Sequence, residues 1–105
     1  MRETEILVTP WPAGAEVSER ELRQRLAREN LFPYRWSNGP HDVYGAHMHP
    51  YNKVIYVVSG SITFGLPQLS KRFLLTAGDR LDLPKDTVHE AFVGPDGVVC
   101  LEAHC

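Results

Sequence analysis

The chain has 105 residues, a formal net charge of −2 at pH 7 and a sequence pI near 6.2. This length predicts one domain with a modest core, near the size at which many domains rely on a partner subunit or a metal. Lys and Arg are not in clustered excess, so neither a nucleic acid nor a membrane surface is expected as a partner. No apolar run is long enough to span a bilayer or to act as a signal segment.

Cysteine usage indicates the compartment. Only Cys100 and Cys105 are present, separated by four residues, whereas small secreted domains usually carry more cysteines at spread positions. We therefore expect a reducing environment and a cytoplasmic protein. Cys100 lies within an apolar run and is expected to be a small buried side chain.

One helix is predicted from about Glu19 to Glu29. Ser18 is suited to be its N-cap, and Glu21 at the third helical position completes a capping box. Leu22 and Leu26 give only a narrow apolar stripe. This pattern predicts a helix on the outside of a larger body.

After the turn at Asn38-Gly39-Pro40 the pattern changes to short β-prone runs separated by Gly, Pro, Asp and Ser, which predicts an all-β domain. Eight such runs suit a double-sheet jelly roll. We expect one domain over residues 1–105, with residues 1–40 as a strand, helix and lead-in and residues 41–105 as the barrel core. Turns are expected at Ser59-Gly60, Ala77-Gly78-Asp79, Pro84-Lys85-Asp86 and Pro95-Asp96-Gly97. The expected strands are Glu5–Thr9, Val43–Met48, Val54–Ser59, Ser61–Leu66, Arg72–Leu75, Arg80–Leu83, Val88–Val93 and Val98–Ala103.

In the run from Val54 to Val58, the side chains that would point to either face of a strand are all apolar or aromatic. Such a strand is covered on both faces, here by the barrel interior on one side and by the helix or a second subunit on the other. Because the domain is small and has sheet edges to cover, we expect a homodimer.

Three histidines are the candidate metal ligands. His47 and His49 are two positions apart, so in a strand they project from the same face, and His89 begins a later strand. An imidazole set suits Fe, Mn, Zn, Ni or Cu, and three protein ligands leave positions open for water, oxygen or a chelating substrate.

The residues around these histidines follow two spaced patterns. Gly45 to Gly60 reads G-x-H-x-H-x3-K-x6-G, and Gly78 to His89 reads G-x5-P-x-D-x2-H. Both resemble the two motifs of the cupin superfamily, over roughly residues 40 to 105. The resemblance implies a double-stranded β-helix barrel that holds a metal through the three histidines. Lys53 stands where the first motif usually has a glutamate as the fourth ligand.

Lys53 bears on the chemistry of this site. An ammonium about 5 Å from a divalent ion is repelled by about 6 to 7 kcal/mol at an effective dielectric of 20. Lys53 must therefore turn away, be neutral, or face an anionic substrate group that bridges ion and ammonium. The alternative is that it begins a strand and extends to solvent. Three-histidine sites without the glutamate occur in the superfamily among iron-dependent dioxygenases.

Two more residues are weaker candidates for the site. His41 follows a turn and is expected in a solvated loop. His104, next to Cys105, ends the last expected strand, where it could line the barrel, although chain ends fray.

Three functions remain open from the sequence. The first is a small metal-dependent enzyme, dioxygenase-like or isomerase-like, acting on a small anionic or chelating metabolite whose anion is bound by Lys53. The second is a non-catalytic module that binds or senses such a molecule. The third is a metal-free acid/base isomerase with His49 or His89 as the base. Fold alone does not choose among them.

Overall fold

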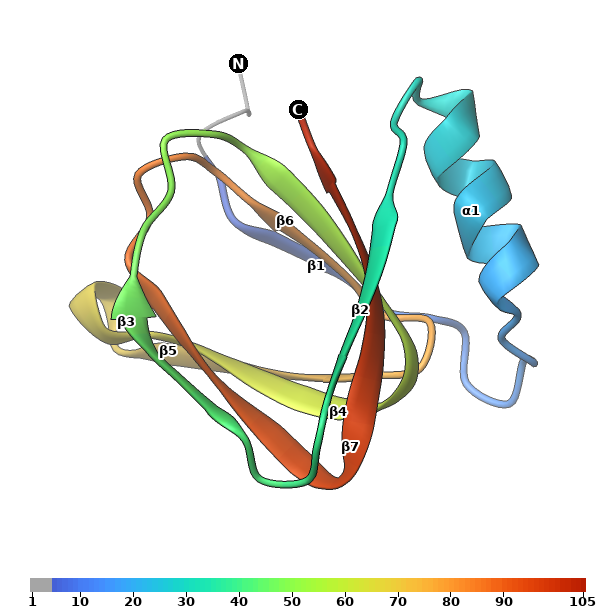
Figure 1. Ribbon diagram of the computed structural model, residues 1–105. Coiled ribbons are helices and arrows are strands. Elements are labelled where there is room, and N and C mark those ends of the chain that lie inside the picture. Colours follow the sequence, from blue (N-terminus) through green and yellow to red (C-terminus); the bar gives the residue numbers. More distant parts are fainter. Residues whose placement is uncertain (1–4) are drawn as a thin grey trace.

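The computed structural model describes residues 5–105 and contains antiparallel strands around a barrel interior, with one helix outside (Figure 1). This is the all-β jelly roll with an N-terminal helix that the sequence predicted. The elements are β1 (Leu7–Thr9), α1 (Glu19–Arg28), β2 (Tyr34–Asn38), β3 (Val43–His47), β4 (Lys53–Leu66), the 3-10 turn Pro67–Leu69, β5 (Lys71–Thr76), β6 (Arg80–Leu83) and β7 (His89–His104).

Two long strands belong to both sheets of the barrel. The first sheet has the order β1-β6-β4-β7-β2 and uses residues 53–60 of β4 and 98–104 of β7. The second has the order β5-β4-β7-β3 and uses residues 61–66 of β4 and 89–93 of β7. Each long strand therefore passes from one sheet to the other and joins them into a double-stranded β-helix.

The predicted boundaries of these two strands were wrong at the corners, the points where each strand bends from one sheet to the other. The sequence predicted turns at Ser59-Gly60 and at Pro95-Asp96-Gly97, and four separate strands around them. The structure has two continuous strands whose pairing shifts register at these points. Gly60 (φ 79°) and Gly97 (φ 77°) face each other there, and their left-handed backbone lets both strands bend without ending.

Strand β2 was missed by the sequence analysis, which placed these residues in the lead-in. It pairs with the end of β7, with Tyr34 opposite Glu102 and Trp36 opposite Cys100. Two neighbouring breakers, Pro33 and the turn after Asn38, hide this five-residue strand. The strand contributes to the site, because Tyr34 and Trp36 line the barrel interior.

The helix forms where the capping pattern predicted and ends one residue earlier. The Oγ of Ser18 accepts a hydrogen bond from the backbone N–H of Glu21 at 3.1 Å. Leu22 and Leu26 are fully buried against the outer face of the first sheet. The apolar run of β4 is thus covered by the barrel on one face and by α1 on the other. Among the residues that the structure describes, no helix is long and apolar enough to cross a membrane.

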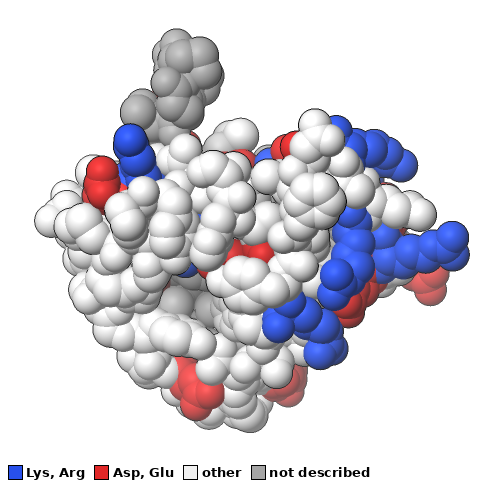
Figure 2. Space-filling view, turned by 45° about the horizontal axis from the view of Figure 1, so that its top comes forward, with Lys and Arg blue, Asp and Glu red and all other residues white. Residues whose placement is uncertain are grey.

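Apolar side chains fill the inside of the barrel. They come from both halves of β4 and β7 and from β5 and β6, and part of this core borders a pocket. The face in Figure 2 is mostly uncharged and hollowed near its centre, while most Lys and Arg side chains in view gather on the α1 side. The buried core residues are Ile55, Val57, Ile62, Phe64, Leu66, Leu75, Leu81, Leu83, Ala91, Val93, Val98 and Cys100.

Candidate metal centre

The fold brings the three predicted histidines together at one end of the second sheet. His47 ends β3 and pairs with His89, the first residue of β7. His49 lies two residues beyond the end of β3, where its carbonyl accepts a hydrogen bond from the N–H of Asp86 at 2.8 Å. One ligand nitrogen of each imidazole lies within 4.8 Å of the other two.

Backbone carbonyls orient two of these rings. The Nδ1 of His89 lies 2.9 Å from the carbonyl oxygen of Thr87, and the Nδ1 of His47 lies 2.6 Å from that of Gly45. A carbonyl only accepts, so each Nδ1 carries the proton and each Nε2 keeps a free lone pair. The Nε2 of His89 is buried and has no hydrogen-bond partner within residues 5–105. A buried lone pair beside two other imidazoles fits a divalent transition metal.

The protonation of the cluster also fits a metal. Burial lowers the pKa of His89 to about 4, with smaller contributions from Lys53 and the other two imidazoles. Burial, followed by the charge of Lys53, also lowers the pKa of His49. Both rings are therefore neutral at pH 7, which is the form that binds a metal ion.

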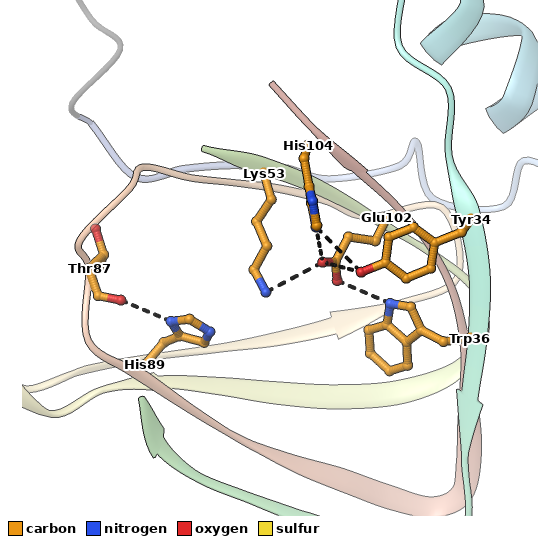
Figure 3. A network of polar contacts seen from close by, with 7 residues as sticks. All are labelled: Tyr34, Trp36, Lys53, Thr87, His89, Glu102 and His104. Carbon is orange, nitrogen blue, oxygen red and sulfur yellow. Dashed lines mark hydrogen bonds and ion pairs between the residues drawn. The ribbon is translucent and has the colours of Figure 1, made fainter. Parts of the chain in front are cut away.

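Lys53 points into the barrel. Its side chain is 9% exposed, and its Nζ lies 3.6 Å from Oε2 of Glu102 (Figure 3). The lysine thus does not extend to solvent, which was one reading of the sequence. Its charge is balanced by Glu102, a carboxylate from the neighbouring strand β7. The sequence analysis did not predict this ion pair.

Glu102 is the centre of a buried polar network. It accepts hydrogen bonds from the Tyr34 hydroxyl at 2.7 Å and from Trp36 Nε1 at 3.1 Å, and His104 Nε2 lies 2.9 Å away. Burial raises the pKa of Glu102, but the hydrogen bonds and Lys53 outweigh it and hold the pKa below its ordinary value. The carboxylate is therefore charged at neutral pH and matches the ammonium of Lys53.

Sequence reasoning missed Glu102, although a signal was present. Cys100, Glu102 and His104 alternate along β7 and share the face that lines the barrel. A charged residue within the otherwise apolar segment Val98–Ala103 is unusual, because an unpaired buried charge is costly. Three of its four partners, Tyr34, Trp36 and Lys53, come from β2 and β4, so only the strand register reveals them.

A cavity of about 260 Å³ lies between the histidines and this network. Lys53 and Glu102 border it, and aromatic rings form much of its wall. Tyr51 stacks between His49 and His104, with ring centroids 5.1 and 4.0 Å apart. The remaining lining residues are Tyr34, Trp36, Tyr44, Ile55, Ile62, Phe64, Ala91, His47 and His89.

The other candidates lie outside the histidine cluster. His41 is exposed in a turn with φ 63°. His104 contacts Glu102 rather than the three histidines. Cys100 is fully buried, as predicted, and burial raises the pKa of its thiol to about 12, which makes it unreactive at neutral pH. Cys105 is exposed, and both thiols are free.

No protein-family model and no curated protein matches the chain, whereas many solved structures do. An RmlC-like cupin from Shewanella frigidimarina is 24% identical with a TM-score of 0.61, over 70% of this chain and 64% of that one. The polyketide cyclase RemF from Streptomyces resistomycificus is 22% identical with a TM-score of 0.61, over 71% of this chain and 54% of that one.

A third match extends along nearly the whole chain. A DUF861-family protein from Thermotoga maritima is 14% identical with a TM-score of 0.61, over 96% of this chain and 100% of that one. The chain spans less than two thirds of the first two proteins, so the likeness concerns the barrel. Its two sheets share the long strands β4 and β7, as in a double-stranded β-helix, and the chain is a small domain with the cupin fold.

Proposed function

We propose that this protein is a metal-dependent enzyme that binds a small oxygen-chelating molecule on a divalent metal held by His47, His49 and His89. The observation that carries the proposal is the buried Nε2 of His89, which has no partner among the described residues and faces two other imidazoles. Three protein ligands leave coordination positions for a substrate. The fold shared with a polyketide cyclase supports an enzymatic use of such a pocket.

The residues beside the histidines favour proton transfer, an isomerase-like reaction. A bound metal would supply a Lewis acid that polarises a substrate carbonyl. Lys53 borders the same cavity, and burial lowers the pKa of its ammonium although Glu102 opposes the shift. Lys53 is therefore suited to exchange a proton with the substrate. Glu102, surrounded by Tyr34, Trp36 and His104, is a positioning residue for Lys53.

Metal content tests the first part of the proposal. Protein purified without added metal is expected to contain one transition-metal ion per chain by elemental analysis. His89→Ala should lose it, whereas His41→Asn, outside the cluster and compatible with a positive φ, should retain it. Metal retained in full by His89→Ala would show that the ligand assignment is wrong.

Proton transfer can be measured on a simple enolisable probe. We expect the metal-loaded protein to accelerate deuterium exchange at the methyl group of pyruvate, followed by proton NMR. Lys53→Met should lose most of the acceleration while it keeps the metal, and Lys85→Met, at an exposed lysine, should keep both. No acceleration by the loaded wild-type protein would contradict the isomerase-like reaction.

We also infer that the protein is a cytoplasmic homodimer. The helix covers only the first sheet, and Val43 and Leu74, each 65% exposed, lie on the outer face of the second sheet in one row with Thr63 and Phe92. This row is suited to a second copy. The two free thiols fit a reducing compartment. Light scattering should give twice the 11.9 kDa chain mass, and a monomer at micromolar concentration would contradict the dimer.

A further inference from the structure

We infer that the cavity takes a ligand of one chemical class: a small chelator whose oxygen donors are attached to a flat aromatic or conjugated body. The inference rests on the proposed function, because the metal binds the chelating group. It adds the nature of the remainder of the ligand, which the histidines do not determine.

The aromatic side chains in the wall of the cavity are the main support for this inference. Five aromatic side chains, from β2, β3, β4 and the loop after β3, surround the space beside the histidines. Figure 3 shows Tyr34 and Trp36 beyond Glu102, on the side away from His89. The pocket thus combines ligand nitrogens and Lys53 with an extensive ring surface. The five aromatic residues are Tyr34, Trp36, Tyr44, Tyr51 and Phe64.

The polar atoms of three of these aromatic side chains already have partners. The Tyr34 hydroxyl and the Trp36 Nε1 donate to Glu102, and the Tyr44 hydroxyl donates to Asn38 Oδ1 at 2.5 Å. These three side chains therefore offer ring carbons to a ligand, not unused donors. The hydrogen bonds also hold the rings in place, which reduces the cost of ordering them when a flat ligand packs against them.

The size of the cavity limits the conjugated part of the ligand to about one ring. Drug-sized ligands occupy pockets of roughly 300 to 1,000 Å³, and the volume here is about 260 Å³. An apolar cavity of about 150 Å³ is sufficient for benzene. One ring and a chelating group can therefore be accommodated, whereas a fused polycycle would have to extend out of the opening.

The charges of the pocket give a second restriction. Within residues 5–105, Lys53 is the one Lys or Arg that lines the cavity, and Glu102 pairs with it at 3.6 Å. A second carboxylate on the ligand would gain little from Lys53, because Glu102 already balances the charge of this lysine. The aromatic wall, rather than a further charge, is thus the main surface that can distinguish one chelator from another.

Two hydroxamates provide a matched test. Acetohydroxamate and benzohydroxamate share the chelating group and differ in a methyl against a phenyl substituent. With zinc-loaded protein in isothermal titration calorimetry, we expect benzohydroxamate to bind at least tenfold more tightly. Phe64→Leu and Tyr44→Leu should reduce this ratio severalfold, because they weaken benzohydroxamate binding more than acetohydroxamate binding. Phe92→Leu makes the same change on the outer face of the second sheet and should keep the full ratio.

The outcomes separate this inference from the proposed function. Equal affinity of the wild-type protein for the two hydroxamates would overturn the inference and leave the metal site standing. Binding of neither compound, or failure to take up zinc, would overturn the proposed function and the inference together. The wild-type comparison decides the matter even if a pocket variant folds poorly.

Discussion

Lys53 and Glu102 form an ion pair inside the barrel, with 3.6 Å between Nζ and Oε2 and less than a tenth of either side chain exposed. They lie diagonally on the adjacent strands β4 and β7, where Lys53 opposes His104 and Glu102 opposes Ile55. The acid that the cupin motif usually places at position 53 is thus replaced by a lysine, and a carboxylate stands one strand away. The pair lets an ammonium lie near three candidate metal ligands without an uncompensated charge.

Removal of one partner should destabilise the protein more than removal of both. Lys53→Met leaves Glu102 buried without its cation, so the free energy of unfolding at pH 7 should fall by about 3 kcal/mol. Adding Glu102→Gln removes the second charge, while the amide oxygen can still accept from one of the two donors, Tyr34 or Trp36, which bind different carboxylate oxygens. The double variant should recover much of the loss in urea unfolding of the metal-free protein. Strictly additive losses would show that the two charges are not coupled.

Exchanging the two residues should strengthen metal binding. Lys53→Glu with Glu102→Lys keeps an opposite-charge pair inside the barrel and moves the carboxylate to the position of the usual fourth ligand. We expect the affinity for a divalent metal to rise at least tenfold, which is about 1.4 kcal/mol. Chelator competition against wild type measures it. Lys53→Glu alone is the control, because it places two carboxylates together and should lower stability.

Acid should destabilise the metal-free protein through His89. The pKa of this ring is about 4 in the fold and about 6.5 when unfolded, so the unfolded state binds more protons between these values. The contribution of His89 is complete above pH 6.5 and lost as the pH falls to 4, by about 3 kcal/mol. Urea unfolding at pH 7, 5.5 and 4 should show a smaller decline for His89→Gln. An equal decline would mean that other groups cause it.

Local patterns predicted the features that depend on neighbours in the chain. Ser18 and Glu21 are three residues apart, and the cap they form is present. His47 and His49 share one short segment, and His89 follows a motif with fixed intervals, so the cluster was foreseeable from the family resemblance. The capping pattern involves only neighbours in the chain, whereas the pairing of β3 with β7 brings His47 beside His89, which the family resemblance implied.

Features set by strand register were not predictable. Glu102 obtains three of its partners, Tyr34, Trp36 and Lys53, from β2 and β4, dozens of residues earlier, and nothing near it in the sequence indicates them. The corners at Gly60 and Gly97 were predicted as turns. A glycine that adopts a positive φ gives the same sequence signal in a hairpin turn and in a strand that passes from one sheet to the other. Only the pairing of β4 with β7 separates these cases.

The corner at Gly60 provides a test of how the barrel holds its pocket. Its φ is 79°, and a Cβ there would overlap the carbonyl oxygen of Gly97. Gly60→Ala must therefore adopt a left-handed backbone and displace a facing strand. We expect a loss of about 3 kcal/mol or more in the free energy of unfolding, measured in urea.

Gly14 is the matched control for this substitution. It has nearly the same φ, 80°, but no atom of the described residues lies within 4 Å of an added Cβ, so Gly14→Ala should cost only about 1 to 2 kcal/mol for the backbone. Gly60 also joins the half of β4 that carries Lys53 to the half that carries Phe64. Gly60→Ala should therefore weaken benzohydroxamate binding, and Gly14→Ala should not. Equal losses of stability in the two variants would show that the facing backbone yields, and that the corner does not hold the two sheets in place.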